Sequence, residues 1–147
     1  MTRMTRIAGF GLASIFFLAS AVMAQAPRSS WQTERAAMLK LVVERARRHV
    51  QDVRARAAIG TMAAIDVRTS ETSLANLERL VDADVTSAFT RVGPTGPQRA
   101  AQRIRFAEAM NAVDLAEVKL NNGMITTAAM DASLAAAAAV FLGPPVK

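Results

Sequence analysis

Residues 31–59 carry a regular apolar repeat that limits the possible folds more than any other feature of the chain. Apolar side chains recur in steps that alternate between three and four residues, at Ala36, Leu39, Val43, Ala46, Val50, Val53 and Ala57. This spacing places them along one side of an α-helix, as in the seam of a coiled coil. Gly60 follows, and glycine commonly ends a helix. The segment therefore predicts a long helix that packs against another helix.

Three further segments have helical patterns, and glycine or proline residues separate them. We expect helices over residues 66–92, 98–120 and 126–141. The core-facing positions expected in the first two are Leu74, Leu77, Val81, Val85, Phe89, Ile104, Phe106, Ala107, Met110, Val113 and Leu120. The last helix is expected to stop before Gly143-Pro144-Pro145.

Residues 93–97, Gly-Pro-Thr-Gly-Pro, are expected to form a rigid linker. The predicted fold is therefore all-α, with one hairpin over residues 31–92 and a second over 98–142. These hairpins are expected to form an antiparallel four-helix bundle or an elongated, coiled-coil-like pair. The composition agrees, because abundant alanine favours helices with close interfaces over sheets. The chain has no cysteine, so packing has to stabilise it without disulfides.

The first 24 residues have the three-part layout of a secretory signal peptide. Arg3 and Arg6 supply the positive start, an uncharged apolar run follows, and Val22-Met23-Ala24 provides small residues at the cleavage site. We expect cleavage after Ala24, which leaves residues 25–147 as a single helical domain in the periplasm or secreted. The alternative is an uncleaved short anchor, although the run is shorter than the about 20 residues that span a bilayer.

Charge patterning supports the first hairpin. The first predicted helix is rich in arginine and the second leans acidic. Folding the chain back after Gly60 places Arg54 opposite Glu71, and the same register places Arg47 opposite Glu78. Such exposed pairs contribute about 0 to 1 kcal/mol each, so their role is to fix the register; the alternative is that these charges are simply solvated. The predicted partner-binding residues are Arg45, Arg47, Arg48 and Arg54.

The two predicted turns, after Gly60 and after Gly123, have similar sequences. One explanation is a repeated helical hairpin; the alternative is that any two turns of the helix–glycine–helix type look alike. Gly60, Asp66, Val67 and Leu74 in the first resemble the periplasmic hairpin turn of outer-membrane efflux channels, the TolC-like family. Gly123 and Ile125 are similar to the second turn of that family. The resemblance implies α-hairpins that pack side by side in an envelope assembly. Those channels also carry membrane β-strands, which this sequence lacks, so pore formation is not implied.

Residues for catalysis or metal binding are sparse. His49 is the only histidine and follows Arg45-Ala-Arg-Arg, and we expect it on a helix surface, with a pH sensor or general base as the alternative. No metal or cofactor site is expected, because such sites need clusters of ligands. An enzyme is not expected; the alternative is an all-helical mutase that binds an anionic substrate through Arg35, Lys40, Arg47 and Glu44.

The expected function is therefore that of an exported, non-enzymatic envelope protein that acts through helix–helix contacts. Its partner would be another envelope protein or a second copy. Alanines in the last helix allow a close approach of another helix: Ala128, Ala129, Ala132, Ala135, Ala136 and Ala139. A formal net charge of +6 allows contact with an anionic membrane surface, while nucleic acid is not expected outside the cell. The alternative is a small periplasmic chaperone.

Overall fold

A computed structural model describes residues 30–87 and 93–142 of the chain. These residues form four helices and no strands: α1 (Ser30–Ala58), α2 (Ala64–Ser87), α3 (Gly96–Asn121) and α4 (Thr127–Leu142). The predicted all-α class is confirmed. The predicted helix bounds agree within two residues, and the predicted end of the second helix at residue 92 lies outside the described residues. The proposed signal peptide, Phe89 and the Gly-Pro-Pro stop lie outside the described residues.

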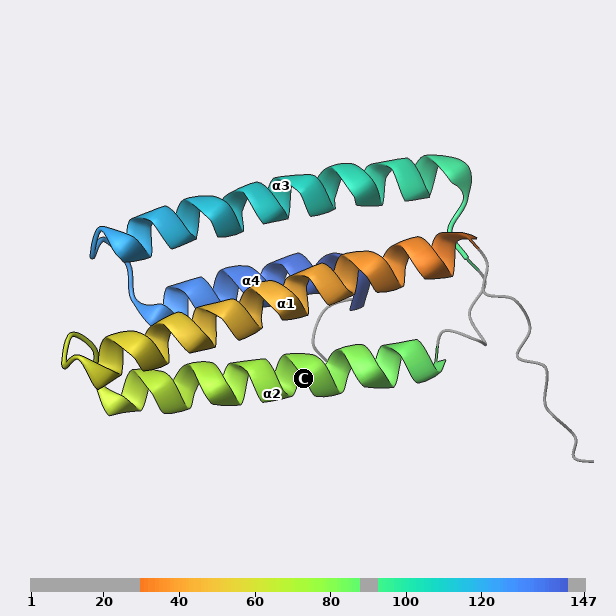
Figure 1. The fold of residues 1–147 in the computed structure, drawn as a ribbon. Coiled ribbons are helices and arrows are strands. Elements are labelled where there is room, and N and C mark those ends of the chain that lie inside the picture. The colour runs from red at the N-terminus through yellow and green to blue at the C-terminus, as the bar shows by residue number, and fades with distance from the viewer. Residues whose placement is uncertain (1–29, 88–92, 143–147) are drawn as a thin grey trace, which may run out of the picture.

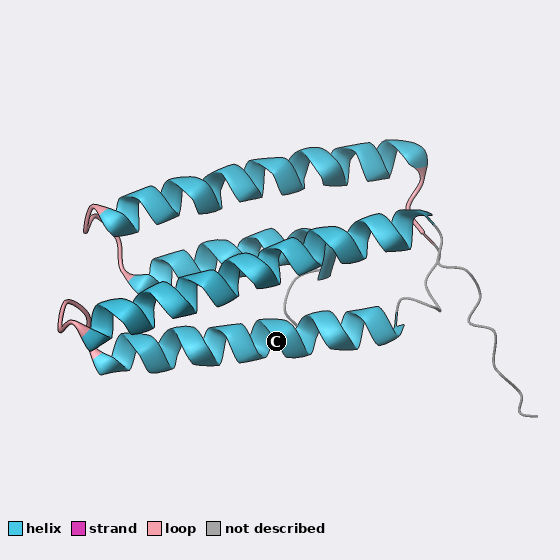
Figure 2. Cartoon of the chain, in the orientation of Figure 1, coloured by secondary structure: helices cyan, strands magenta, loops and turns pink. Residues whose placement is uncertain are grey.

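The helices run alternately in opposite directions along a four-helix bundle (Figure 1). The α1–α2 and α3–α4 turns lie at the same end, and short loops form both of them (Figure 2). α1 packs against α2 and α4, and α4 also packs against α2 and α3. α1 and α4 therefore lie in the middle of the bundle, with α2 on one side and α3 on the other (Figure 1). None of the described helices is both long enough and apolar enough to cross a bilayer.

The predicted seam of α1 forms the centre of the core. Leu39, Val43, Ala46, Val50 and Val53 are all buried, and Val42 joins them. α1 buries a stripe wider than a two-helix seam because it packs against both α2 and α4. At the end away from the turns, the ring of Phe141 lies 6.0 Å from that of Trp31 and 5.3 Å from that of Phe106, measured between centroids.

The prediction that Ile104 faces the core is wrong, since its side chain is 61% exposed. The buried residues of α3 are Phe106, Val113, Ala116 and Leu120, and the three larger ones lie at steps of seven. Residues two apart on a helix lie about 200° apart around its axis. Ile104 and Phe106 therefore cannot both face α4, and the larger aromatic side chain takes the core position. The expected core position Ala107 is also exposed.

Glycines in left-handed conformation end both α1 and α3, with φ of 76° at Gly60 and 69° at Gly123. In the first turn Thr61 N donates to Arg56 O at 3.0 Å and Gly60 N donates to Ala57 O at 3.0 Å. The second turn has the same two bonds, from the amides of residues 124 and 123. This is the Schellman pattern, which favours glycine because other residues are strained at positive φ.

The predicted linker is shorter than expected at its C-terminal side. α3 already begins at Gly96, and proline occupies its first turn. The Thr95 side chain and the Gln98 side chain cap this turn reciprocally, and Thr95 N donates to Gln98 Oε1 at 2.9 Å. Proline suits the first turn because its missing N–H would have no helical partner there.

Candidate functional site

The two predicted ion pairs across the first hairpin are confirmed. The Arg47 Nη2–Glu78 Oε1 and Arg54 Nη2–Glu71 Oε1 distances are both 2.7 Å. Because α1 and α2 are antiparallel, seven residues forward on one helix match seven residues back on the other. These pairs fix the register along one edge of the hairpin.

The other two predicted partner-binding residues lie on the side of α1 that faces α3. Arg45 forms ion pairs with Asp114 and Glu117 of α3. Arg48 is exposed and lines, with Arg45 and His49, a polar pocket of about 220 Å³ between α1 and α3. Three of the four predicted arginines are thus engaged within the chain, and their role in partner binding stays a prediction.

His49 is not on the surface, which corrects the expectation from sequence. Its side chain is 4% exposed, and its Nε2 lies 3.4 Å from Oδ1 of Asp131 on α4. Ser70 of α2 donates to Oδ2 of the same carboxylate at 3.0 Å. His49 follows Val42 by seven residues, so it occupies the wide buried stripe of α1 despite its arginine neighbours. We call these three residues, one from each of three helices, the histidine clamp.

A second buried polar contact joins the same three helices near their other end. Arg35 Nη2 of α1 donates to Asp84 Oδ1 of α2 at 2.5 Å and to the Phe141 carbonyl of α4 at 2.7 Å. The carbonyls of the last helical turn have no partner within the helix, so a guanidinium there is favourable. We call Arg35, Asp84 and Phe141 O the arginine clamp. It lies fourteen residues from the histidine clamp along both α1 and α2.

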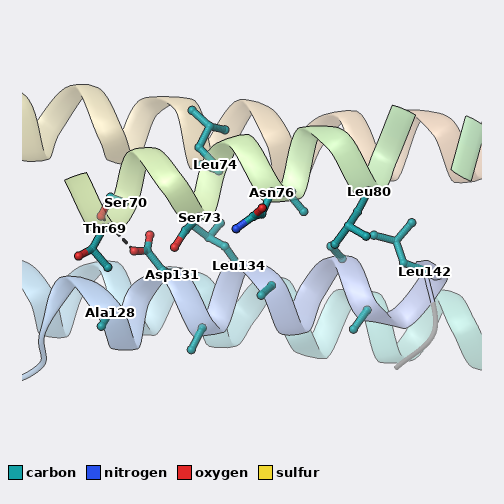
Figure 3. A pocket seen from close by; sticks show the side chains of 16 residues that line it. Thr69, Ser70, Ser73, Leu74, Asn76, Leu80, Ala128, Asp131, Leu134 and Leu142 are labelled. Carbon is teal, nitrogen blue, oxygen red and sulfur yellow. Dashed lines mark hydrogen bonds between the residues drawn. The ribbon is translucent and has the colours of Figure 1, made fainter. Parts of the chain in front are cut away.

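Between the clamps, α2 and α4 form the walls of an apolar groove of about 460 Å³. Ala46 of α1 also lines it. Ser70 and Asp131 meet at one end, and Leu80 and Leu142 lie at the other (Figure 3). The α4 wall carries a stripe of small side chains in steps of four, three and four: Ala128, Ala132, Ala135 and Ala139.

The groove exists because α4 presents alanine where α2 presents larger side chains. Met130, Leu134 and Phe141 fill the core from the inner side of α4. On the outer side the alanine side chains are too short to close the space beside Leu77 and Leu80. Among the described lining residues, Asp131 alone is ionisable, and the histidine clamp holds it. The groove is therefore mainly apolar, with a carboxylate at the end where Ser70 and Asp131 meet and with the polar side chains of Ser73 and Asn76 on its α2 wall.

The described side chains do not form a recognisable catalytic arrangement. Ser70 donates to a carboxylate rather than to the imidazole of His49, so it lacks the adjacent base that activates a serine nucleophile. Of the four residues of the mutase alternative, Arg35 is buried against Asp84, Arg47 is paired with Glu78, and Lys40 Nζ lies 3.9 Å from Glu44 Oε1. The described part of the chain holds no group of three or more His, Cys, Asp or Glu suited to a metal ion.

The predicted turn residue Asp66 has a structural contact beyond its turn. Thr127 Oγ1, in the first turn of α4, donates to Asp66 Oδ1 at 3.1 Å. Sequence reasoning found Asp66 but missed Ser70, Asp84 and Asp131. A usable signal existed for Asp131, since it is the single charged residue between Thr127 and Leu142, in a helix of which half the residues are alanine.

Comparison of the chain with protein-family models, with curated proteins and with solved structures finds no match.

Proposed function

We propose that this chain is an exported, non-enzymatic protein of the cell envelope that binds an α-helix of a partner protein in its α2–α4 groove. The observation that carries the proposal is the alanine stripe of α4, which lines a mainly apolar groove (Figure 3). Small side chains let a second helix approach closely, and an amphipathic helix in an apolar groove is a recurrent mode of recognition.

The size of the groove fits such an occupant. Its α4 wall runs from Ala128 to Leu142. At 1.5 Å per residue this is about 21 Å, or about four helical turns. A partner helix with apolar residues at positions i, i+3, i+4 and i+7 would place its larger side chains over the alanines. Its polar side would remain in solvent.

The clamps favour a groove that exists before the partner arrives. Arg35 reaches from α1 to both walls, and Ser70 of α2 donates directly to Asp131 of α4, so the spacing of α2 and α4 is fixed at two points. A preformed site loses less conformational entropy on binding than one that has to order itself. The resemblance to efflux-channel hairpins supports an envelope role, and a detached hairpin domain of that kind is one form the protein can take.

Site-specific photocrosslinking in cells tests the proposal. A photoreactive phenylalanine derivative replaces Asn76 or Ala135 in the groove, and Ala101 on α3 serves as the exposed control. We expect both groove positions, and not position 101, to give the same dominant crosslinked envelope protein. Ala135→Trp should abolish the product from position 76 by filling the groove. Because Ala135 is exposed, this substitution should change the free energy of unfolding by no more than about 0.5 kcal/mol, as urea denaturation would show.

Other crosslinking patterns would overturn the proposal in defined ways. A product of twice the mass of the chain would identify a second copy as the occupant. Many unrelated periplasmic proteins at low yield would favour the chaperone, which should also suppress client aggregation. Equal products from position 101 and the groove would exclude the groove as the specific surface.

A further inference from the structure

A segment of this chain outside the described residues has the length of a helix that fits the α2–α4 groove. The predicted signal peptide, residues 1–24, is called the leader here, and residues 7–22 are its uncharged apolar run. As a helix at 1.5 Å per residue, this run would be about 24 Å long, against about 21 Å for the α4 wall of the groove. The two lengths therefore agree within about two residues of helix.

The connection to α1 brings this run to one end of the groove. Trp31 is the second residue of α1, and its ring lies 6.0 Å from that of Phe141, measured between centroids. The next residue, Leu142, lies at that end of the groove (Figure 3). Residues 23–29 can span about 25 Å when extended, whereas packed helices lie only about 8 to 10 Å apart. The leader would therefore enter the groove at the Leu142 end with Val22 and run toward the opposite end.

This direction matches the leader to the alanine stripe of α4, because the two helices would run parallel. A register that sets Val22 beside Leu142 also pairs the small and large side chains of the two helices: Leu12 lies beside Ala132, Ile15 beside Ala135 and Ala19 beside Ala139. Larger side chains would thus cover two of the alanines, and two alanines would meet where the helices approach most closely. The other face of the leader helix would carry mostly small side chains, with two phenylalanines: Phe10, Ala13, Ser14, Phe17, Ser20 and Ala21.

The distribution of charge favours the same direction. Asp131 is the one ionisable residue among the described residues that line the groove, and it lies at the end that the start of the leader would reach. Arg3 and Arg6 precede the apolar run, so the positive start of the leader would lie toward this carboxylate. On α2, Asp66 and Arg68 precede the lining residues at this end, and their charges offset each other. In the reverse direction the two leader arginines would lie at the apolar end instead.

We infer that the leader of an uncleaved chain occupies the groove as an apolar helix and keeps a partner out until the leader is removed. The inference rests on the proposed function, because it takes the groove as a site that binds a helix. A segment joined by a short flexible linker has an effective concentration of about millimolar, so it competes well with a separate partner. Cleavage after Ala24 would release this occupant and expose the groove.

The absence of cysteine from the sequence makes a direct test possible. In the purified full chain, Ala19→Cys with Ala139→Cys should form an intramolecular disulfide on mild oxidation, seen as faster migration on a non-reducing gel. The control pair, Ala19→Cys with Ala128→Cys, joins the leader to the other end of the groove and should not form one. Equal yields from both pairs would show a tethered leader without a fixed site. Disulfide-linked dimers would place the leader on a second copy, and either result would overturn the inference.

The reactivity of a single cysteine tests whether the leader closes the groove. Ala135→Cys in the full chain should react with a maleimide about tenfold more slowly than the same cysteine in a chain with Leu12→Asp and Ile15→Asp, because a site open in one tenth of the molecules reacts at about a tenth of the rate. The matched pair Ala13→Asp and Ala21→Asp adds the same two charges to the other face of the leader. It should leave the reactivity at position 135 as slow as in the parent chain.

The remaining controls give each outcome a definite meaning. Ala101→Cys, exposed on α3, should react at the same rate in all of these chains. Fast reaction at position 135 in the parent chain, or equal acceleration by both aspartate pairs, would overturn the inference. Failure of the proposed function is seen elsewhere: a leader that does not dock leaves partner crosslinking at position 76 of the exported chain unaffected, and a missing partner crosslink leaves the leader disulfide unaffected.

Discussion

Two sides of the bundle differ in the side chains that occupy the space between neighbouring helices. Between α1 and α3, long charged side chains fill the space. Arg45 forms ion pairs with Asp114 and Glu117. Arg103 donates from Nε to Glu34 Oε1 at 2.5 Å and from Nη2 to Glu34 Oε2 at 2.6 Å. Between α2 and α4, short side chains leave an apolar groove. On the charged side, the arginine side chains named here have acidic partners within the chain. The apolar side leaves a surface that another helix would complete.

The difference shows where partner binding should be sought. A basic helix looks like the natural docking surface in the sequence, yet most of its predicted contact arginines already have acidic partners on α2 and α3. The alanine-rich helix carries few polar groups and leaves apolar surface open. Exposed ion pairs contribute little to stability, whereas apolar area removed from water contributes in proportion to its size. The following substitutions test this contrast.

The largest effect is expected from the arginine clamp that frames the apolar side. Arg35→Ala takes a charge partner from the buried carboxylate of Asp84 and a donor from the Phe141 carbonyl. Breaking a buried ion pair is costly, so the free energy of unfolding should fall by about 3 kcal/mol. Urea denaturation followed by circular dichroism measures this. Arg47→Ala, which breaks an exposed pair, is the control and should cost no more than about 1 kcal/mol.

A smaller effect is expected on the charged side. Arg45→Ala removes two ion pairs whose carboxylates are about half exposed, so the cost should be about 1 kcal/mol. Salt screens partly exposed charges, so the difference from the parent chain should shrink in 1 M sodium chloride. Denaturation curves at low and high salt provide the comparison. A cost of 3 kcal/mol that salt did not change would mean that α1–α3 is as tightly held as the clamps.

The smallest effect is a dependence on pH. The hydrogen bond from Arg103 lowers the pKa of the Glu34 carboxyl from its usual 4.5 and raises the pKa of the guanidinium. A carboxyl with a lowered folded-state pKa stabilises the fold above its unfolded-state value. That stabilisation declines as the pH falls below 4.5 and is lost below the folded-state pKa. Glu34→Gln should therefore unfold at lower urea than the parent chain at pH 7, with the gap closing in acid. A gap that widened in acid would contradict this assignment.

The sequence was most informative where neighbouring segments pack. Arg54 opposite Glu71 follows from a tight turn and an antiparallel hairpin, since the register is then fixed by counting residues. The buried position of His49 could not be found in this way, because it depends on α4, more than 70 residues further along the chain. Its arginine neighbours indicated a surface, while the contact with Asp131 places it in the core.

The groove could not be predicted from the sequence for a different reason. Alanines occur on nearly all faces of α4, so the sequence pattern does not show which of them face the core. Ala137 and Ala138 are buried, whereas Ala135 and Ala136 are exposed. Met130, Leu134 and Phe141 decide the orientation of the helix, and the outer alanines then form the groove by default. The choice between Ile104 and Phe106 on α3 was likewise decided by packing against another helix.

The clamps also have a consequence for the order in which the chain can fold. Arg35 and His49 belong to the first hairpin, but Phe141 O and Asp131, which complete their contacts, belong to the last helix. A first hairpin alone would expose to water the apolar side of α1 and α2 that α4 covers, which disfavours a stable half-molecule. The two hairpins are therefore halves of one cooperative unit rather than stacked modules. A newly made chain reaches its full stability when its final sixteen-residue helix docks.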